Sequence, residues 1–215
     1  MKQHQDGLDT KARIIIAACE MIDEDPASTL SVRTVAARAG VSMGSLRHHF
    51  PTQRALRDAV LETIYDVVAP DGQIIHDKAV PARDRLVQCL RQVLRVEIGE
   101  QSRQAWIKFF DAFIAAEPTD DIRTAYLAMA SEGERRIEHW LTILAKEDAL
   151  PESDIAAYAK LLNTVLNGLS MERALPSDES ILQRETEILY TAVDSILSTG
   201  SRGRSVTNVH RSGTL

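Results

Sequence analysis

Residues 32–50, VRTVAARAGVSMGSLRHHF, decide the fold of this chain. Ser31, just before them, is a good N-cap, and apolar residues then recur at helical spacing as far as Ala39. Gly40 follows, as a chain that leaves a helix through a left-handed turn requires. Ser42 can cap a second, very short helix. The stretch therefore predicts two short helices on either side of a tight turn, which is the layout of a helix-turn-helix.

The second of these helices is the predicted DNA-contacting element, because a helix-turn-helix places it in the major groove. Leu46 and Phe50 anchor this helix, and its polar positions face solvent. An arginine there can pair with guanine or hold a phosphate, and serine or histidine can do either more weakly. The start of the following helix can offer backbone N–H groups to a phosphate. The candidate DNA-binding residues are Arg33, Ser42, Met43, Gly44, Ser45, Arg47, His48, His49, Thr52, Gln53 and Arg54.

Net charge at first argues against a nucleic-acid partner, because the 215 residues carry a formal charge of −6. The distribution of charge reverses that impression, since residues 26–60 contain five arginines and a single acid, Asp58. Binding to DNA needs only such a local basic field. The acidic remainder of the chain should also discourage other orientations on DNA.

The simpler interpretation of this stretch is a plain helical hairpin with solvated arginines. A longer pattern favours DNA binding, because residues 29–60, TLSVRTVAARAGVSMGSLRHHFPTQRALRDAV, resemble the N-terminal DNA-binding domain of the TetR family of transcriptional regulators. The matching elements are the Thr/Ser-Val start, Ala36-Ala37-Arg38-Ala39-Gly40-Val41-Ser42, Gly44-Ser45-Leu46, His49-Phe50 and Leu56.

Two positions depart from the pattern that this resemblance implies. Arg47 stands where the family usually has a tyrosine that touches the DNA backbone, and Gln53 stands where it usually has a lysine. Arg47 can make the same contact with more charge, and Arg54 or backbone amides can take over the second contact. By the same resemblance, His49 packs near the helix end or touches a phosphate.

Helical periodicity runs through nearly the whole chain, and strand signals are almost absent. We therefore expect an all-α fold of about nine helices, with an N-terminal three-helix helix-turn-helix domain and a C-terminal helical bundle for ligand binding and dimerisation. The expected domains are residues 1–52 and 70–199, linked by a helix over 53–69, with the junction in 70–81. Residues 200–215 have no periodicity and are expected to form a disordered tail.

An aromatic stripe marks the C-terminal part of the chain. Trp106, Phe109, Phe110 and Phe113 share one helical face, which is typical either of an ordinary core or of an effector pocket. Both can hold at once, because pockets between bundle helices are lined by core side chains. The candidate ligand-pocket residues are Trp106, Phe109, Phe110, Phe113, Tyr126, Met129, Trp140, Tyr158 and Leu162.

The region from about 104 to 175 resembles the C-terminal domain of regulators of the choline–betaine repressor (BetI) type. This resemblance rests on Trp106, Phe109 and Ala112, then Tyr126, Trp140-Leu141 and Asn167-Gly168-Leu169. It implies a small-molecule effector. An aromatic box for a quaternary ammonium ion is physically possible, but members of this subgroup have quite different ligands.

The last two expected helices, over 153–174 and 178–198, carry apolar stripes too wide for one contact. Either both faces are buried within one chain, or the helices pair with a second copy as a two-fold four-helix interface. We favour the second, because the family resemblance implies a homodimer that spaces two binding helices symmetrically. Gly168 would allow close helix approach there. The candidate interface residues are Leu166, Leu169, Ile188, Leu189, Ala192 and Ile196.

Several protein classes are disfavoured. No apolar run is long enough to span a membrane and the first ten residues are polar, so we expect a cytoplasmic protein. Cys19 and Cys89 are expected to be free thiols. The sequence shows no nucleophile–base set, phosphate loop or metal cluster, so we expect no enzyme activity, cofactor or metal. The adjacent His48 and His49 point about 100° apart on a helix and do not readily share one ion.

These observations together predict a ligand-responsive, DNA-binding transcriptional regulator. We expect a repressor that a small molecule releases from a palindromic double-stranded operator. Activation in place of repression is the alternative, and a helical interaction module without DNA binding is a second one. The basic segment 26–60 argues against the latter.

Overall fold

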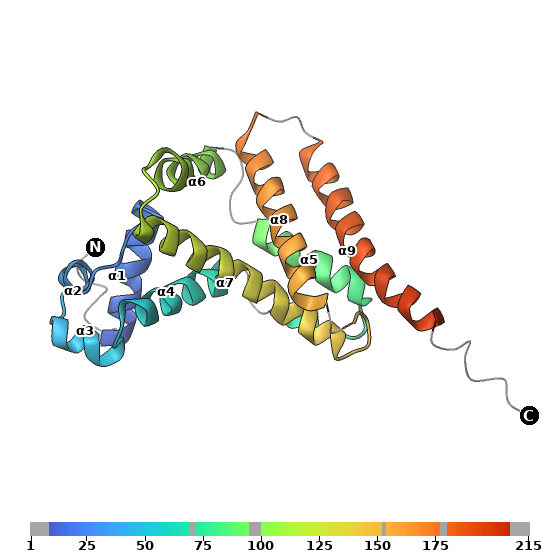
Figure 1. The fold of residues 1–215 in the computed structure, drawn as a ribbon, viewed down its shortest axis with the longest axis horizontal. Coiled ribbons are helices and arrows are strands. Elements are labelled where there is room, and N and C mark those ends of the chain that lie inside the picture. The colour runs from blue at the N-terminus through green and yellow to red at the C-terminus, as the bar shows by residue number, and fades with distance from the viewer. Residues whose placement is uncertain (1–8, 69–71, 95–99, 152–153, 177–179, 207–215) are drawn as a thin grey trace, which may run out of the picture. The chain divides into compact units, whose positions relative to one another are not determined.

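A computed structural model describes residues 9–68, 72–94, 100–151, 154–176 and 180–206. Within these ranges the chain contains nine α-helices and no strand, which confirms the predicted all-helical class. The helices are α1 (Thr10–Glu24), α2 (Val32–Ala39), α3 (Met43–His49), α4 (Gln53–Val68), α5 (Ala82–Leu94), α6 (Glu100–Phe110), α7 (Asp120–Ala145), α8 (Ile155–Ala174) and α9 (Ile181–Val206) (Figure 1). A short 3-10 helix, η2 (Gln73–His76), precedes α5, and a π-helical turn, η3 (Asp111–Ala115), continues α6.

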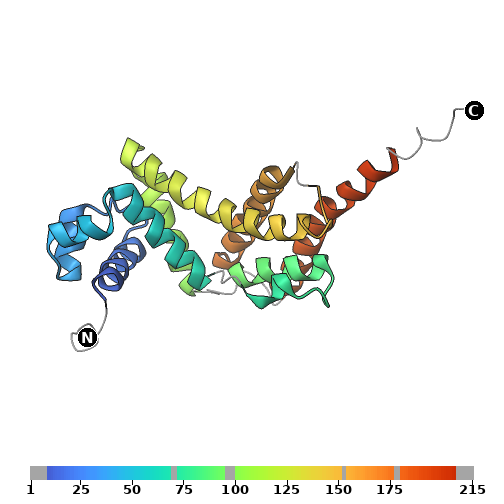
Figure 2. The same cartoon turned by 90° about the horizontal axis from the view of Figure 1, so that it is seen from below.

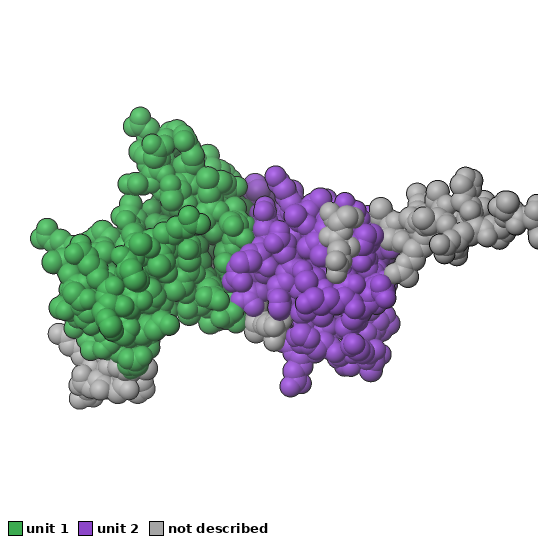
Figure 3. Space-filling model, turned by 60° about the horizontal axis from the view of Figure 1, so that its bottom comes forward, with its two compact units in different colours: residues 1–67, 104–132 green, residues 68–103, 133–215 purple. Residues whose placement is uncertain are grey.

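The chain divides into two compact units, and each combines two separate stretches (Figure 3). Unit 1 comprises residues 1–67 and 104–132, and unit 2 comprises residues 68–103 and 133–215. The division near residue 68 lies close to the expected junction. The segment 104–132, in contrast, belongs to the same unit as the helix-turn-helix, whereas the sequence predicts it within a separate C-terminal domain.

The core of unit 1 lies among α1, α2, α3 and the start of α4 (Figures 1 and 2). Small side chains permit this, because Ala17, Ala18, Ala36 and Ala39 are all buried and let the helices cross closely. Larger buried side chains fill the remaining space; these are Ile14, Leu30, Val35, Leu46, Phe50, Leu56 and Val60. The apolar periodicity in the sequence therefore faces inward in each of these helices.

Leu30 closes this core at a conformational cost. Its φ of 50° lies in the left-handed region, which a non-glycine residue enters only at about 1–2 kcal/mol. Its side chain is completely buried, and burial of a leucine contributes about 1.5–3 kcal/mol. Burial thus offsets the strain and fixes the path of the chain into α2.

The core of unit 2 lies among η2, α5, the C-terminal half of α7, α8 and α9. Trp140 is its largest fully buried side chain. In Figure 1, α8 and α9 lie side by side, and the residue contacts agree. Ile75 of η2 is also fully buried, so part of the expected junction 70–81 is packed into this core.

Ion pairs tie the helices of unit 2 together. Arg85 of α5 donates to both carboxylate oxygens of Glu147, at 2.5 and 3.3 Å, and to the carbonyl oxygen of Ile75 at 2.6 Å. The hydrogen bond from Arg85 lowers the pKa of Glu147. Because Arg85 reaches both η2 and the end of α7, it fixes three elements at one point.

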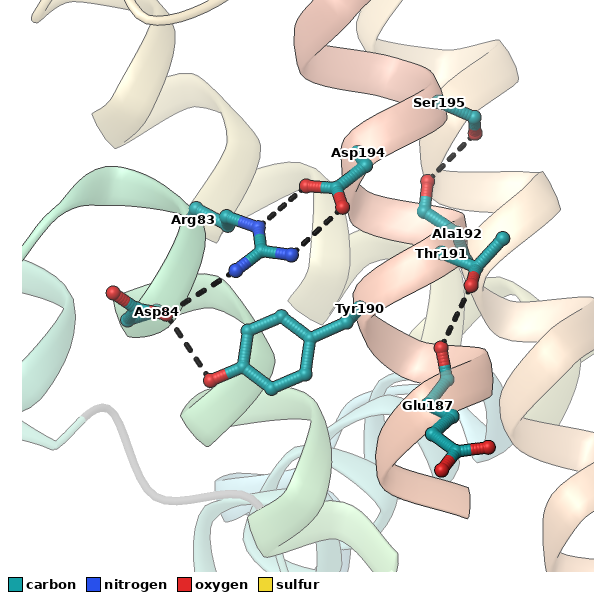
Figure 4. Close-up of polar contacts among 8 residues, drawn as sticks. All are labelled: Arg83, Asp84, Glu187, Tyr190, Thr191, Ala192, Asp194 and Ser195. Atoms are coloured by element: carbon teal, nitrogen blue, oxygen red, sulfur yellow. Dashed lines mark hydrogen bonds and ion pairs between the residues drawn. The ribbon is translucent and has the colours of Figure 1, made fainter. Parts of the chain in front are cut away.

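A second polar cluster joins α5 to α9 (Figure 4). Arg83 forms a bidentate pair with Asp194, at 2.5 and 2.7 Å, and its guanidinium lies 4.3 Å from the ring centroid of Tyr190. The Tyr190 hydroxyl donates to Asp84 at 3.1 Å. The hydrogen bond from Arg83 lowers the pKa of Asp194, and burial, followed by the bond to Asp84, raises the pKa of Tyr190. The cluster sets the register of α9 on α5.

The C-terminal helix is longer than the sequence predicts. Helix α9 runs to Val206, so it continues past residue 200, where a disordered tail is expected. The remainder of that predicted tail, residues 207–215, lies outside the described residues.

Candidate nucleic-acid interface

Helix α2 has a defined cap at each end. The Ser31 hydroxyl accepts from the backbone N–H of Thr34 at 3.2 Å, as predicted for an N-cap. At the other end Gly40 has a φ of 63°, and the N–H groups of Gly40 and Val41 donate back to the carbonyls of Ala37 and Ala36. This is a Schellman ending, which a glycine in the left-handed region makes possible.

Helix α3 begins after the three residues Gly40–Ser42 and presents an exposed polar face. The Ser42 hydroxyl accepts from the Ser45 N–H at 3.0 Å, which confirms the predicted N-cap. Leu46 is fully buried and Phe50 is nearly so, and both side chains anchor the helix in the core of unit 1. Arg47 and His48 face solvent, and Met43 is 53% exposed. An exposed short helix held by a buried anchor is what insertion into a groove requires.

The other candidate residues lie around α3 within unit 1. Arg33, Ser42, Gly44, Thr52, Gln53 and Arg54 are exposed, and Ser45 and His49 are half-buried. Thr52 caps α4 by accepting from the Ala55 N–H at 3.0 Å. The Gln53 side chain donates to the carbonyl of Thr29. Its amide is therefore engaged within the chain.

The basic segment offers less charge to solvent than the sequence suggests. Arg57 is buried and donates to the Ser28 carbonyl at 2.5 Å, and its burial lowers its pKa. Arg38 pairs with Glu24 of α1 at 2.7 Å. Arg33 and Arg47 are exposed. Burial and pairing thus concentrate the available positive charge of residues 26–60 at fewer positions.

Arg13 of α1 is a residue that the sequence analysis does not single out. Its Nη2 atom donates to the carbonyl oxygens of both Ala39 and Gly40, each at 2.8 Å. These carbonyls lie 26 and 27 residues away along the chain. No local pattern could reveal the contact, because it exists only once α1 packs on α2.

The aromatic stripe forms a half-exposed cluster in unit 1. Trp106, Phe109, Phe110, Phe113 and Tyr126 make ring contacts with centroids 5.0–6.4 Å apart, in tilted or edge-to-face arrangements. Phe110 is 38% and Tyr126 44% exposed, and the other three are half-buried. The interpretation of the stripe as ordinary core is therefore wrong, because none of its rings is fully buried. Met129 is half-buried on α7 in the same unit.

The other three predicted pocket residues lie in unit 2. Trp140 and Leu162 are fully buried in its core, and Tyr158 packs against that core. The structure therefore divides the predicted pocket set between the two units.

Most of the predicted dimer interface is buried within the single chain. Leu166, Leu169, Leu189 and Ile196 are at most 4% exposed because they form the contact between α8, α9 and their neighbours in unit 2. They retain no appreciable surface for a second copy, so these four assignments are wrong. Ile188 is 39% exposed, and Ala192 is half-buried. Helix phase alone cannot separate packing within a chain from packing between chains.

Among the residues that the structure describes, no group of three His, Cys, Asp or Glu side chains is arranged to hold a metal ion. None of the helices in that part of the chain combines the length and the apolar character that crossing a membrane demands.

Comparisons with known proteins agree with the geometry of this surface. Residues 14–60 match the model for bacterial regulatory proteins of the tetR family. The HTH-type transcriptional regulator CymR of Pseudomonas putida is 22% identical over 85% of this chain and 88% of its own. An uncharacterized HTH-type transcriptional regulator of Mycobacterium tuberculosis is 24% identical over 85% of this chain and 92% of its own.

Solved structures share the fold. A putative transcriptional regulator from Pseudomonas aeruginosa PAO1 superposes with a TM-score of 0.54 at 22% identity, covering 94% of this chain and 98% of its own. A putative TetR-family regulator from Rhodococcus sp. gives 0.54 at 21% identity, covering 87% and 98%. Residues 14–60 of this chain are thus a DNA-binding domain of the kind found in bacterial regulatory proteins of the tetR family.

Proposed function

We propose that the protein is a homodimeric repressor that binds a palindromic operator through α3 and leaves it when a small molecule binds. The observation that carries this proposal is the exposure of Arg47 and His48 on a short helix anchored by the buried Leu46. Two such helices related by a two-fold axis would meet successive major grooves roughly 34–36 Å apart. The candidate contacts stay those of the sequence analysis, with Gln53 acting through its backbone.

Helix α8 offers a surface for the second copy in place of the residues that are buried. Its exposed face carries small and apolar side chains at intervals of three and four residues, namely Ala157, Leu161, Thr164, Gly168 and Met171, and Leu175, directly after the helix, is exposed as well. Such spacing forms a continuous stripe on a helix. Leu182 and Ile188 of α9 are exposed as well. Pairing two copies through this stripe would bury apolar side chains that water now surrounds.

The aromatic cluster is the proposed effector-contacting surface. Its five rings leave part of their faces accessible, and aromatic rings can hold apolar or cationic small molecules. Trp140 and Leu162 drop out of the proposed lining because their side chains are already enclosed by the core of unit 2. A ligand can act only through different affinities for the DNA-binding and non-binding conformations.

Selection of genomic fragments by the purified protein tests DNA recognition, and the recovered operator then serves as the probe. Arg47→Ala should weaken operator binding by about 1–3 kcal/mol if Arg47 reads a base. If it holds a phosphate, the loss should be similar on all sequences and the salt dependence should be shallower. Lys146→Ala is the matched control, because it removes one exposed cation that lies outside the proposed DNA-binding, dimer and effector surfaces.

Unchanged operator affinity of Arg47→Ala at low salt would remove Arg47 from the interface. Failure of the wild-type protein to enrich any sequence would overturn the proposed function as a whole. Genes beside the selected sites would then indicate which small molecules to test as effectors. Higher expression of those genes when the protein is deleted supports repression, and lower expression indicates activation.

A further inference from the structure

The backbone carbonyl groups at the C-terminal end of α2 need hydrogen-bond donors from outside the helix. The last four carbonyls of a helix have no partner within the helix. The Schellman ending satisfies the carbonyls of Ala36 and Ala37, because the N–H groups of Val41 and Gly40 return to them. The carbonyl of Ala39 and that of Gly40, in the turn itself, are left for other donors.

Arg13 supplies those donors from a different helix. A single terminal nitrogen, Nη2, bridges the two carbonyls at 2.8 Å each. Its positive charge also lies at the negative end of the α2 dipole, where a cation is favoured. The contact is close, since a Cβ atom on Gly40 would lie 3.0 Å from Nη2. A Cβ atom at position 40 would therefore require Nη2 to shift by a few tenths of an ångström.

We propose that Arg13 is a positioning residue for operator recognition, which fixes the α2–α3 turn and thereby the angle at which α3 leaves it. The inference rests on the proposed role of α3 in DNA recognition. Only Gly40, Val41 and Ser42 separate the two helices. A small change at the carbonyls held by Arg13 therefore reorients α3 directly, while Leu46 still anchors the far side.

Arg13→Met tests this, because it keeps the alkyl stem and removes the donors. Operator affinity is expected to fall about tenfold or more, whereas affinity for non-specific DNA should change little. The slope of log affinity against log salt should stay as in wild type, since a positioning residue neutralises no phosphate. Arg13→Lys keeps a cation with several donors and should recover part of the affinity.

A control separates positioning from a loss of stability. Ile14→Val trims a fully buried side chain next to Arg13 and should lower the unfolding temperature without changing operator affinity well below it. Lys11→Met removes an exposed cation from the same helix and should leave operator affinity intact. Amide hydrogen exchange gives a readout that needs no DNA. The N–H groups of Gly40 and Val41 should exchange faster in Arg13→Met than in Ile14→Val.

Several outcomes would overturn the proposal. One is an operator affinity for Arg13→Met within twofold of wild type, and another is unaltered exchange at Gly40 and Val41. If Arg13→Met lowers the affinity for all DNA sequences equally and makes the dependence of affinity on salt shallower, Arg13 is a phosphate contact instead. If Arg13→Met does not fold, the exchange measurement on Arg13→Lys decides. Absence of specific binding by the wild-type protein would count against the proposed function, and the exchange measurement would still judge Arg13.

Discussion

Arg173 of α8 and Glu185 of α9 form a bidentate ion pair, with Nε–Oε2 and Nη2–Oε1 distances of 2.7 and 2.9 Å. Both side chains are about 5% exposed. Removing two charges from water is costly, so such a pair persists only when its geometry is good. The pair lies between the two helices that carry the proposed dimer surface and fixes how one is placed on the other.

Replacing one residue of this pair should destabilise the protein more than replacing both residues. Arg173→Met leaves the Glu185 carboxylate buried without its partner and should lower the free energy of unfolding by about 3–5 kcal/mol. The double variant Arg173→Met with Glu185→Leu should recover most of that loss, since apolar side chains can fill the same space. Urea denaturation of the wild type, the two single variants Arg173→Met and Glu185→Leu, and the double variant measures the coupling. Equal losses in the single and double variants would show that the charges matter little to each other.

Acidification should weaken unit 2 through two carboxylates. Hydrogen bonds from Arg85 and Arg83 lower the pKa values of Glu147 and Asp194 below those of the unfolded chain. The stability that these pairs contribute is therefore fully present above about pH 5 and is lost as the pH falls through the folded-state pKa values.

Asp194→Asn should flatten this dependence without abolishing it, because the Glu147 carboxylate still titrates. Thermal unfolding measured between about pH 3 and 7 follows the effect. A variant that loses stability on acidification as steeply as the wild type would contradict the assignment to Asp194.

Gly40→Ala should destabilise unit 1, whereas Gly44→Ala should not. Alanine at a φ of 63° costs about 1–2 kcal/mol, and its Cβ would meet Nη2 of Arg13 at 3.0 Å. At Gly44 the nearest atom to a new Cβ is the Ser42 hydroxyl oxygen at 3.8 Å, and alanine favours a helix by about 0.5–1 kcal/mol. Chemical denaturation of both variants compares them. A Gly40→Ala protein as stable as wild type would mean that the turn tolerates another conformation.

Local signals in the sequence predicted the helix-turn-helix well, and tertiary contacts escaped it. The caps at Ser31, Gly40 and Ser42 depend on residues within a few positions of each other, so their chemistry is visible in the chain itself. Arg13 acts on carbonyls far along the chain, and nothing beside it in the sequence marks that role. Nor does the sequence show that the exposed Gln53 donates its side-chain amide to the Thr29 carbonyl, 24 residues away.

The apolar stripes did not predict the dimer interface, for a different reason. Periodicity identifies the face of a helix that avoids water, but it does not say which partner covers that face. Leu166 and Leu189 are covered within the chain, whereas Leu161 and Leu175 remain exposed. The aromatic residues show the same limit, because the sequence does not distinguish the half-exposed Trp106 from the fully buried Trp140.

The two tryptophans should therefore respond differently to a quencher in solution. Trp140→Phe leaves Trp106 as the only tryptophan, and its half-exposed ring should be quenched readily by acrylamide. Trp106→Phe leaves the fully buried Trp140, which should be quenched much less. The Trp140→Phe protein then serves as a sensor, because a ligand on the aromatic cluster should shield Trp106. Equal quenching in both variants would contradict the exposure of the cluster.

The proposed dimer surface makes a sharp prediction at Gly168. A Cβ atom built there meets nothing within 4 Å and the position is exposed, so a side chain added there starts in open space on the single chain. Gly168→Leu should nevertheless weaken the dimer, because the small residue lies in the middle of the exposed stripe of α8, where two helices would approach closely. Sedimentation velocity over a range of concentrations measures the monomer–dimer equilibrium.

Asn167→Leu is the matched control, since its side chain points about 100° away around the helix and should have a smaller effect on the dimer. If Gly168→Leu stays as dimeric as wild type, or if the wild-type protein is a monomer, α8 does not form the contact between copies.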